Sequence, residues 1–236
     1  MNPILLGAAN VLIYFLLAIM IVIPARVLLT IPNELFRKIL HFILLGSFYV
    51  LVISSKTWQI TVIVAIIFEV LLYPILILFE RLKKYSEFTT ERKKGELKRS
   101  LMIVYTMFAV VVAICWGIFK DKYLALASLY AWGIGDAAAA LVGKRFGKHK
   151  IITRGLDGKK SYEGTLAMCL VSCISVFTIL VFRGGMKTVY CIIISVVVGV
   201  VSAVVELFSK DGNDTVFCPI AAMVTLLPLV YLLGGI

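Results

Sequence analysis

Hydrophobic residues in this chain gather in long continuous runs, separated by short polar segments. A helix needs about 20 apolar residues to cross a bilayer. Eight segments approach that length: 4–23, 35–54, 57–79, 100–119, 123–142, 162–182, 188–207 and 219–235. The pattern predicts an all-α, polytopic integral membrane protein with about eight transmembrane helices. Because these segments use most of the 236 residues, we expect one membrane-embedded domain over 1–236.

The composition agrees with a membrane protein. The chain is 61% hydrophobic, with a mean hydropathy of +1.04, whereas an ordinary soluble domain is about half apolar. Its five cysteines form no CxxC pair and four lie inside apolar segments, which favours small buried side chains over disulfides or metal ligands. No Lys or Arg precedes the first segment, so it does not resemble a cleaved signal peptide.

The basic residues predict an orientation. With the N-terminus outside, 19 of the 24 Lys and Arg fall in the inside segments 24–38, 80–99, 143–161 and 208–218. Positive residues favour the cytosolic side, so both termini are expected outside and the basic loops in the cytosol. Such loops attract anionic lipid headgroups. No nucleic-acid-binding motif accompanies them, and no sequence feature indicates the oligomeric state.

Ionisable side chains inside the apolar segments are candidates for function. They are His41, Glu69, Asp136 and Glu206, and each costs about 2.5–3.5 kcal/mol at mid-bilayer on insertion scales. Arg37 and His41 share a helix face, either as functional groups or as a snorkelling arginine and a buried histidine. Glu69 is expected to have a structural role, paired with one of these two basic groups.

Two helices carry rows of small residues near their acids. Ala127, Ala131, Gly135, Ala139 and Gly143 repeat every four residues around Asp136, and Ser195, Gly199 and Ala203 precede Glu206. Such rows let neighbouring helices approach closely. If the two rows pack against each other, they would form a compact acidic site.

The segments that follow these acids suit a polyphosphate. Segment 143–161 combines four glycines, seven Lys and Arg and His149, although its spacing is not that of a Walker A loop. Ser161 is expected to cap the next helix, with Glu163 in the first turn. Segment 206–219 offers Glu206, Asp211, Asn213 and Asp214 as oxygen ligands, and Mg²⁺ prefers one or two carboxylates plus substrate phosphates. Pro219 is expected to begin the last helix.

These motifs resemble the CTP-dependent lipid alcohol kinases, which include dolichol kinase, phytol kinase and yeast-type diacylglycerol kinase. "GDAAAALVGKRFGKHKI" followed by "GKKSYEGTLAM" resembles the nucleotide-binding region of that family. "FRKILHF" resembles its early Arg-Lys-x-x-His element, and "VELFSKDGNDTVFCPI" its late acidic loop. Thr215 stands where the family has asparagine, which leaves Asp211 and Asp214 as alternative acids.

The resemblance implies a set of site residues. The nucleotide- and phosphate-binding candidates, which include the basic Arg145, are Gly135, Gly143, Lys144, Arg145, Gly147, Lys160, Ser161 and Gly164. The catalytic candidates are Asp136, Glu163 and Glu206, and the candidate ligands of Mg²⁺ are Asp136, Glu206 and Asp214. Arg37, Lys38 and His41 are the candidate contacts of the lipid substrate or of a phosphate.

The implied activity is transfer of the γ-phosphate of CTP to the hydroxyl of a membrane lipid alcohol: a diacylglycerol, a polyprenol such as dolichol, or phytol. The central block is also similar to that of phosphatidate cytidylyltransferase, but the Pro-Gly-His-Gly-Gly and Asp-Arg-x-Asp elements of that family are absent. A secondary transporter is the third alternative, since intramembrane acids suit one. The sequence shows no inverted repeat in its favour.

Overall fold

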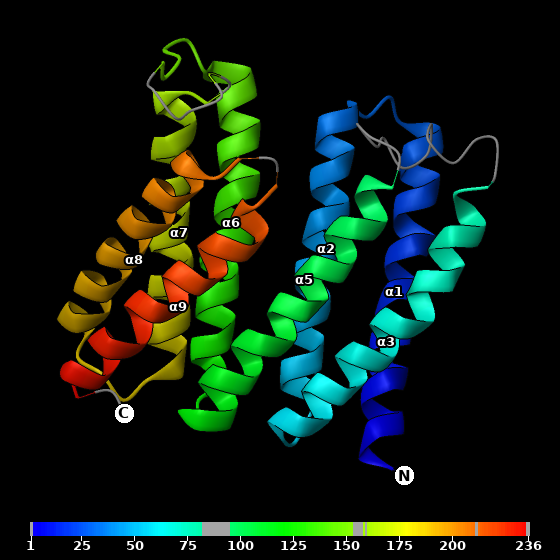
Figure 1. Cartoon of the computed structure of the whole chain (residues 1–236), viewed down its shortest axis with the longest axis horizontal. Helices are drawn as coiled ribbons and strands as arrows, with labels where there is room; N and C mark the ends of the chain where they lie inside the picture. Colours follow the sequence, from blue (N-terminus) through cyan, green and yellow to red (C-terminus); the bar gives the residue numbers. More distant parts are fainter. Residues whose placement is uncertain (1, 82–94, 153–157, 159, 211, 235–236) are drawn as a thin grey trace. The chain divides into compact units, whose positions relative to one another are not determined.

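The computed structural model describes residues 2–81, 95–152, 158, 160–210 and 212–234. In chain order the helices are α1 (Pro3–Leu28), α2 (Asn33–Ser54), α3 (Trp58–Phe79), α5 (Glu96–Val112), the π-helical η1 (Ala113–Ile118), α6 (Lys122–Phe146), α7 (Tyr162–Arg183), α8 (Thr188–Phe208) and α9 (Asp214–Leu232) (Figure 1). Within this part of the chain, eight helices are long and apolar enough to cross a membrane, with η1 continuing α5. The prediction of an all-α, polytopic membrane protein is confirmed.

Two helix boundaries near the polar segments differ from the sequence prediction. α6 continues to Phe146, so Gly143, Lys144 and Arg145 lie in its last turn rather than in a loop. Basic side chains suit that position because the C-terminal end of a helix carries partial negative charge. The prediction that Pro219 begins the last helix is wrong, because α9 begins at Asp214 and holds Pro219 inside it. A carboxylate in the first turn favours this earlier start, and helices within a bilayer tolerate internal proline.

The chain divides into two compact units, Met1–Val110 and Val111–Ile236. Whether they form one catalytic domain stays a prediction, and part of the predicted loop 80–99 lies outside the described residues.

In the first unit, the ring of Phe48 from α2 stacks on Phe108 from α5 at 4.3 Å between centroids. Tyr105 meets Phe48 edge-on, and its hydroxyl lies 3.0 Å from the Ser47 hydroxyl. These aromatic residues are fully buried, so they form the core of this unit.

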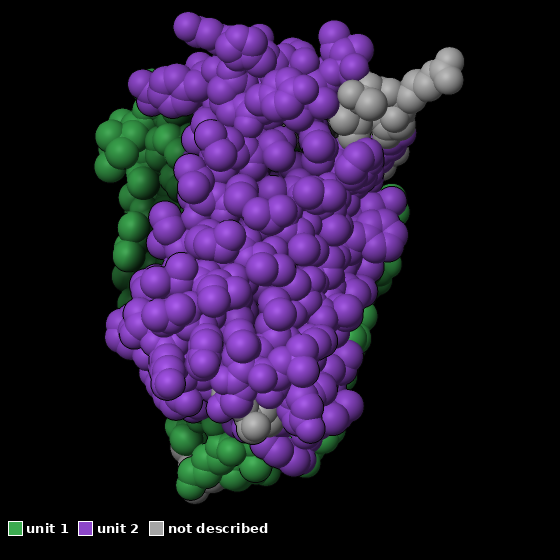
Figure 2. Space-filling view, turned by 90° about the vertical axis from the view of Figure 1, so that its left-hand side faces the viewer, with its two compact units in different colours: residues 1–110 green, residues 111–236 purple. Residues whose placement is uncertain are grey.

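The second unit is built on four helices. α6 packs against α7, α7 against α8, α8 against α9, and α9 returns to α6. Figure 1 shows these helices as the bundle that bears the labels α6 to α9, and Figure 2 shows one face of the unit in purple. Its inner faces are lined by buried residues such as Trp132, Met168 and Ile194. Large apolar side chains cover its outer faces, for example Leu170 and Val200, as expected of helices that face lipid.

The two rows of small residues both pack against α7. A Cβ added at Gly135 of α6 would lie 2.6 Å from the Met168 sulfur, and the Ser172 hydroxyl donates to the Ala131 carbonyl at 2.5 Å. On α8, a Cβ at Gly199 would lie 2.7 Å from the Cys169 carbonyl oxygen. Each row therefore packs closely, as its spacing predicted, and the two rows share α7 as a partner. α7 has small or adaptable residues toward both neighbours, a property that spacing on α6 and α8 alone does not reveal.

Candidate active site

The candidate residues of the second unit meet at one end of its bundle, which we call the loop end. α6 and α8 finish there, and α7 and α9 begin there, since consecutive helices run antiparallel. The opposite end is held by an ion pair between Arg183 at the end of α7 and Asp121, which caps α6. The chain therefore brings the described residues of segments 143–161 and 206–219 to the same end of the bundle.

Glycines allow the loop end to close tightly. A Cβ at Gly164 would lie 3.0 Å from the Ala139 carbonyl oxygen and 3.3 Å from the Gly143 Cα, so α6 and α7 meet almost backbone to backbone. A Cβ at Gly147 would collide with the Gly143 carbonyl oxygen and lie 2.6 Å from the Ser161 hydroxyl. Close packing explains why glycine stands at these positions. Their predicted role in binding phosphate remains a prediction.

The segment between α6 and α7 closes as a short antiparallel pairing. Lys150 and Ser161 form an isolated bridge. The Ile151 amide donates to the Lys160 carbonyl at 3.0 Å, and the Tyr162 amide donates to the His149 carbonyl at 3.1 Å. The Ser161 hydroxyl accepts from the Gly164 amide at 3.2 Å, so the predicted helix cap is confirmed. The pairing fixes both ends of a segment whose residues 153–157 and 159 lie outside the described part.

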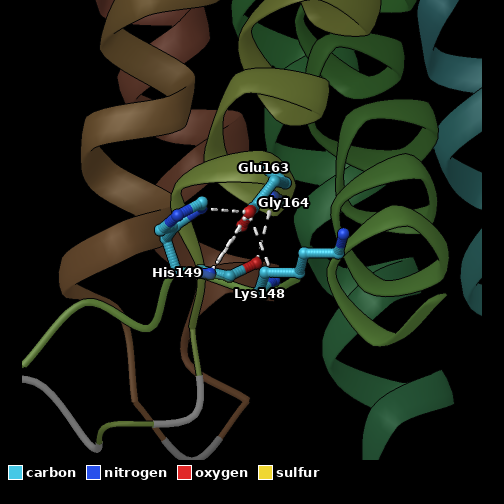
Figure 3. A network of polar contacts seen from close by, with 5 residues as sticks. Lys148, His149, Glu163 and Gly164 are labelled. Carbon is cyan, nitrogen blue, oxygen red and sulfur yellow. Dashed lines mark hydrogen bonds and ion pairs between the residues drawn. The ribbon is translucent and has the colours of Figure 1, made fainter. Parts of the chain in front are cut away.

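Glu163 reaches across this pairing to residues near the start of segment 143–161, which we call the basic segment. Its Oε1 accepts hydrogen bonds from the backbone amides of Lys148 and His149, each at 3.2 Å. The His149 Nδ1 lies 2.8 Å from the same oxygen. Figure 3 shows the carboxylate turned toward the backbone of these two residues. The sequence predicted Glu163 as a first-turn acid and did not predict these contacts.

Lys160 and Glu206 join the basic segment to α8. The Lys160 Nζ lies 2.8 Å from Glu206 Oε1, and it also donates to the Glu206 backbone carbonyl. Only 20% of the Lys160 side chain and 11% of the Glu206 side chain are exposed. A buried carboxylate is stable only when it is paired or hydrogen-bonded, so Lys160 makes the position of Glu206 possible.

Two further carboxylates interact with this pair. Glu206 interacts electrostatically with Asp136 of α6 and with Asp214 of α9 as well as with Lys160. The three acids come from three helices and are separated by up to 78 positions in the sequence, from Asp136 to Asp214. The structure therefore places Glu206 within electrostatic range of the other two acids that the sequence assigned to one site. Asp211, the alternative to Asp214, lies outside the described residues.

Trp132 is a site residue that sequence reasoning missed. It lies one helical turn before Asp136, and its indole Nε1 donates to Asp214 Oδ2 at 3.4 Å. The side chain is only 2% exposed. A buried indole N–H usually finds a partner, but the sequence cannot show that its partner lies on α9, 82 residues later. This contact places Asp214 against α6 on the side that bears Asp136.

The early basic element lies in the first unit, on α2. Arg37 forms an ion pair with Glu34 at 3.1 Å, one helical turn away. Lys38 is 7% exposed, and the His41 ring lies edge-on to the Phe42 ring. Within the described residues, Glu69 accepts a hydrogen bond from Thr106 at 3.3 Å rather than pairing with Arg37 or His41. The role of Arg37, Lys38 and His41 as phosphate or lipid contacts stays a prediction.

The acids satisfy part of what a divalent cation needs. Among the described residues, no three His, Cys, Asp or Glu side chains converge as a complete metal site. Carboxylate oxygens are nevertheless the ligands that Mg²⁺ prefers, and it typically binds through one or two of them plus substrate phosphates. The donor set fits a metal that arrives with a polyphosphate, not one held by protein ligands alone.

Comparison with known proteins identifies one informative relative. The chain is 38% identical over 92 residues to a phytol kinase from Synechocystis, and the match covers 39% of this chain and 37% of the relative. This local similarity supports a relationship to lipid kinases. No protein-family profile matches the chain, and no solved structure matches it.

Proposed function

We propose that this protein is a membrane kinase that transfers the γ-phosphate of CTP to the hydroxyl of a lipid alcohol. The observation that carries the proposal is the cluster of Asp136, Glu206 and Asp214 beside Lys160, next to the basic segment. The local similarity to a phytol kinase supports a kinase of lipids. Phytol, a polyprenol such as dolichol, and diacylglycerol are the candidate acceptors. The choice of CTP rests on the family resemblance of the motifs.

Phosphoryl transfer depends mainly on positioning and on neutralising charge. Lys144, Arg145 and Lys160 are the side chains we assign to the phosphate oxygens. Lys144 and Arg145 are exposed in the last turn of α6, where a charged ligand in water can reach them. Lys160 is already fixed by Glu206, so it can neutralise charge that develops on a phosphate without a large rearrangement.

The acids are assigned to a metal ion and to the lipid hydroxyl. Asp136, with Glu206 or Asp214, would hold Mg²⁺ together with the phosphates, and the ion would neutralise their charge. Asp136 and Asp214 each repel Glu206 electrostatically, and a bound cation would relieve this repulsion. Asp136 lies on the face of α6 that also presents Trp132 to Asp214, and we assign it the main role in orienting the hydroxyl or binding the metal.

The depth of the cluster suits a substrate that stays in the membrane. Glu206 lies on the buried face of α8, while Val204 and Phe208 on the same turns are 48% and 59% exposed on its outer face. Glu206 therefore lies level with the last apolar turn of α8. A hydroxyl at the membrane interface can reach this depth while its hydrocarbon chain remains between or beside the helices.

The proposal places the loop end in the cytosol, where CTP is available. The basis is the bias of Lys and Arg toward that side, with both termini outside. The same residues attract anionic lipid headgroups, which would hold the loops against the membrane surface.

A substrate panel tests the proposal. Purified protein in phospholipid vesicles receives phytol, a polyprenol or diacylglycerol, each with CTP or ATP and with or without Mg²⁺. We expect one acceptor to become a lipid monophosphate, with CTP and Mg²⁺ required and with no product from the Asp136→Asn variant. Movement of a solute across the vesicles without any lipid product would favour the transporter alternative instead.

A further inference from the structure

We propose that Glu163 is a positioning residue, an internal anion that holds the start of the basic segment in the shape that receives the nucleotide phosphates. The inference rests on the proposed function. It departs from the prediction that Glu163 is catalytic, and it is motivated by what the carboxylate contacts.

The contacts of Glu163 belong to the backbone of the segment. Two consecutive amides, those of Lys148 and His149, donate to Oε1 at 3.2 Å, and the His149 amide also lies 3.4 Å from Oε2. The His149 ring adds a third group at 2.8 Å. Consecutive amides that converge on one oxygen form the kind of concavity that binds anions. Here a carboxylate of the protein occupies it (Figure 3).

The position of Glu163 is itself fixed. It lies in the first turn of α7, two residues after the cap residue Ser161, and Gly164 packs against Ala139 and Gly143 of α6. The carboxylate therefore projects from a rigid point toward the residue pair that follows the C-cap Gly147 of α6. In this position the Glu163 carboxylate fixes the direction in which the chain leaves α6 after Phe146.

The residues held in this way lie next to two of the side chains that we assign to the phosphate oxygens. Lys148 and Lys150 are exposed on the same short segment, next to Lys144 and Arg145 in the last turn of α6. If the segment were loose, each binding event would have to order it. Preorganising a binding group lowers that cost and strengthens binding. A positioning role therefore predicts an effect on the KM for CTP, whereas a general base or metal ligand would affect kcat.

Two substitutions at one position separate these roles. Glu163→Gln keeps an oxygen that can accept from the Lys148 and His149 amides, while it removes the charge that a base or metal ligand needs. Glu163→Ala removes both. We expect Glu163→Gln to keep kcat within about threefold, and Glu163→Ala to raise the KM for CTP up to about tenfold, the equivalent of losing one hydrogen bond to a charged group. A kcat that falls in Glu163→Gln as far as in Glu163→Ala would overturn the proposal.

A second measurement does not depend on activity. Hydrogen exchange by mass spectrometry, on the peptide that includes Lys148 and His149, reports directly on the two amides. Exchange should be faster in Glu163→Ala and close to wild type in Glu163→Gln. Glu80→Ala serves as the matched control, because Glu80 pairs with Lys98 in the other unit, and it should leave this peptide unchanged.

The two measurements distinguish failure of the inference from failure of the proposed function. Unchanged exchange in Glu163→Ala would refute the positioning role, whatever the activity. Faster exchange in Glu163→Ala alone, in a protein that phosphorylates no lipid, would support the positioning role and would refute the kinase assignment.

Discussion

Replacing Lys160 with methionine should destabilise the protein, and a second substitution should reverse that effect. Lys160→Met keeps most of the side-chain volume but removes the cation 2.8 Å from Glu206 Oε1. Glu206 then remains largely buried, facing Asp136 and Asp214. Removing one partner of a buried ion pair costs about 3–5 kcal/mol. Because the Lys160 and Glu206 side chains are 20% and 11% exposed, solvent screening reduces our expectation to about 2–3 kcal/mol.

Thermal unfolding in detergent measures this effect. For a chain of this size, 1 kcal/mol shifts Tm by about 2–4 °C, so Lys160→Met should lower Tm by about 5–10 °C. Lys160→Met/Glu206→Gln should recover most of the loss, because a neutral amide needs no cation, yet it should remain inactive. The exposed Lys187, which precedes α8, gives the control: Lys187→Met should stay within about 2 °C of wild type. Equal Tm values for wild type and Lys160→Met would refute the reasoning.

Three further predictions test the site, the topology and the packing. Asp136→Asn should reduce turnover by about 100-fold or more in folded protein, as for a principal electrostatic group; near-normal turnover would remove Asp136 from the site. Cysteines at Ile152 and Lys187, each in a cysteine-free background, should react with an impermeant maleimide from opposite faces; labelling of both from outside would overturn the topology. Gly199→Ala should cost about 1–3 kcal/mol because its Cβ would lie 2.7 Å from the Cys169 carbonyl, whereas Gly7→Ala meets Val64 at 3.4 Å and should be mild in thermal unfolding.

The sequence predicted the helices because length and apolarity alone decide whether a segment can span a bilayer. It predicted the ends less well. The last turn of α6 is basic and glycine-containing, as in a loop, and the helix dipole stabilises it in place. The start of α9 was predicted five residues too late, because proline is a common first residue of a helix. Here Pro219 lies in the interior of the helix, which begins at Asp214.

Asp136 and Glu206 could be selected as candidates from the sequence because a carboxylate in an apolar run is costly and must have a partner, and Asp214 because it lies in a segment rich in oxygen ligands. Their partners could not be predicted, because they come from distant parts of the chain. From the sequence alone, Trp132 cannot be distinguished from an ordinary buried aromatic residue. Only the fold brings its indole to Asp214. Likewise, the spacing of small residues on α6 and α8 shows that each can pack closely. The contacts of Gly135 and Gly199 show that α7 is the common partner.

The central claim is the transfer of the terminal phosphate of CTP to a lipid hydroxyl, and position-specific labelling tests it most directly. The purified protein is incubated with vesicles that contain the acceptor lipid and with CTP labelled at either the α- or the γ-phosphate. The account predicts that only the γ-label enters the lipid, as a monophosphate, with CDP released. Entry of the α-label with release of pyrophosphate would contradict it and would assign the same site to cytidylyl transfer.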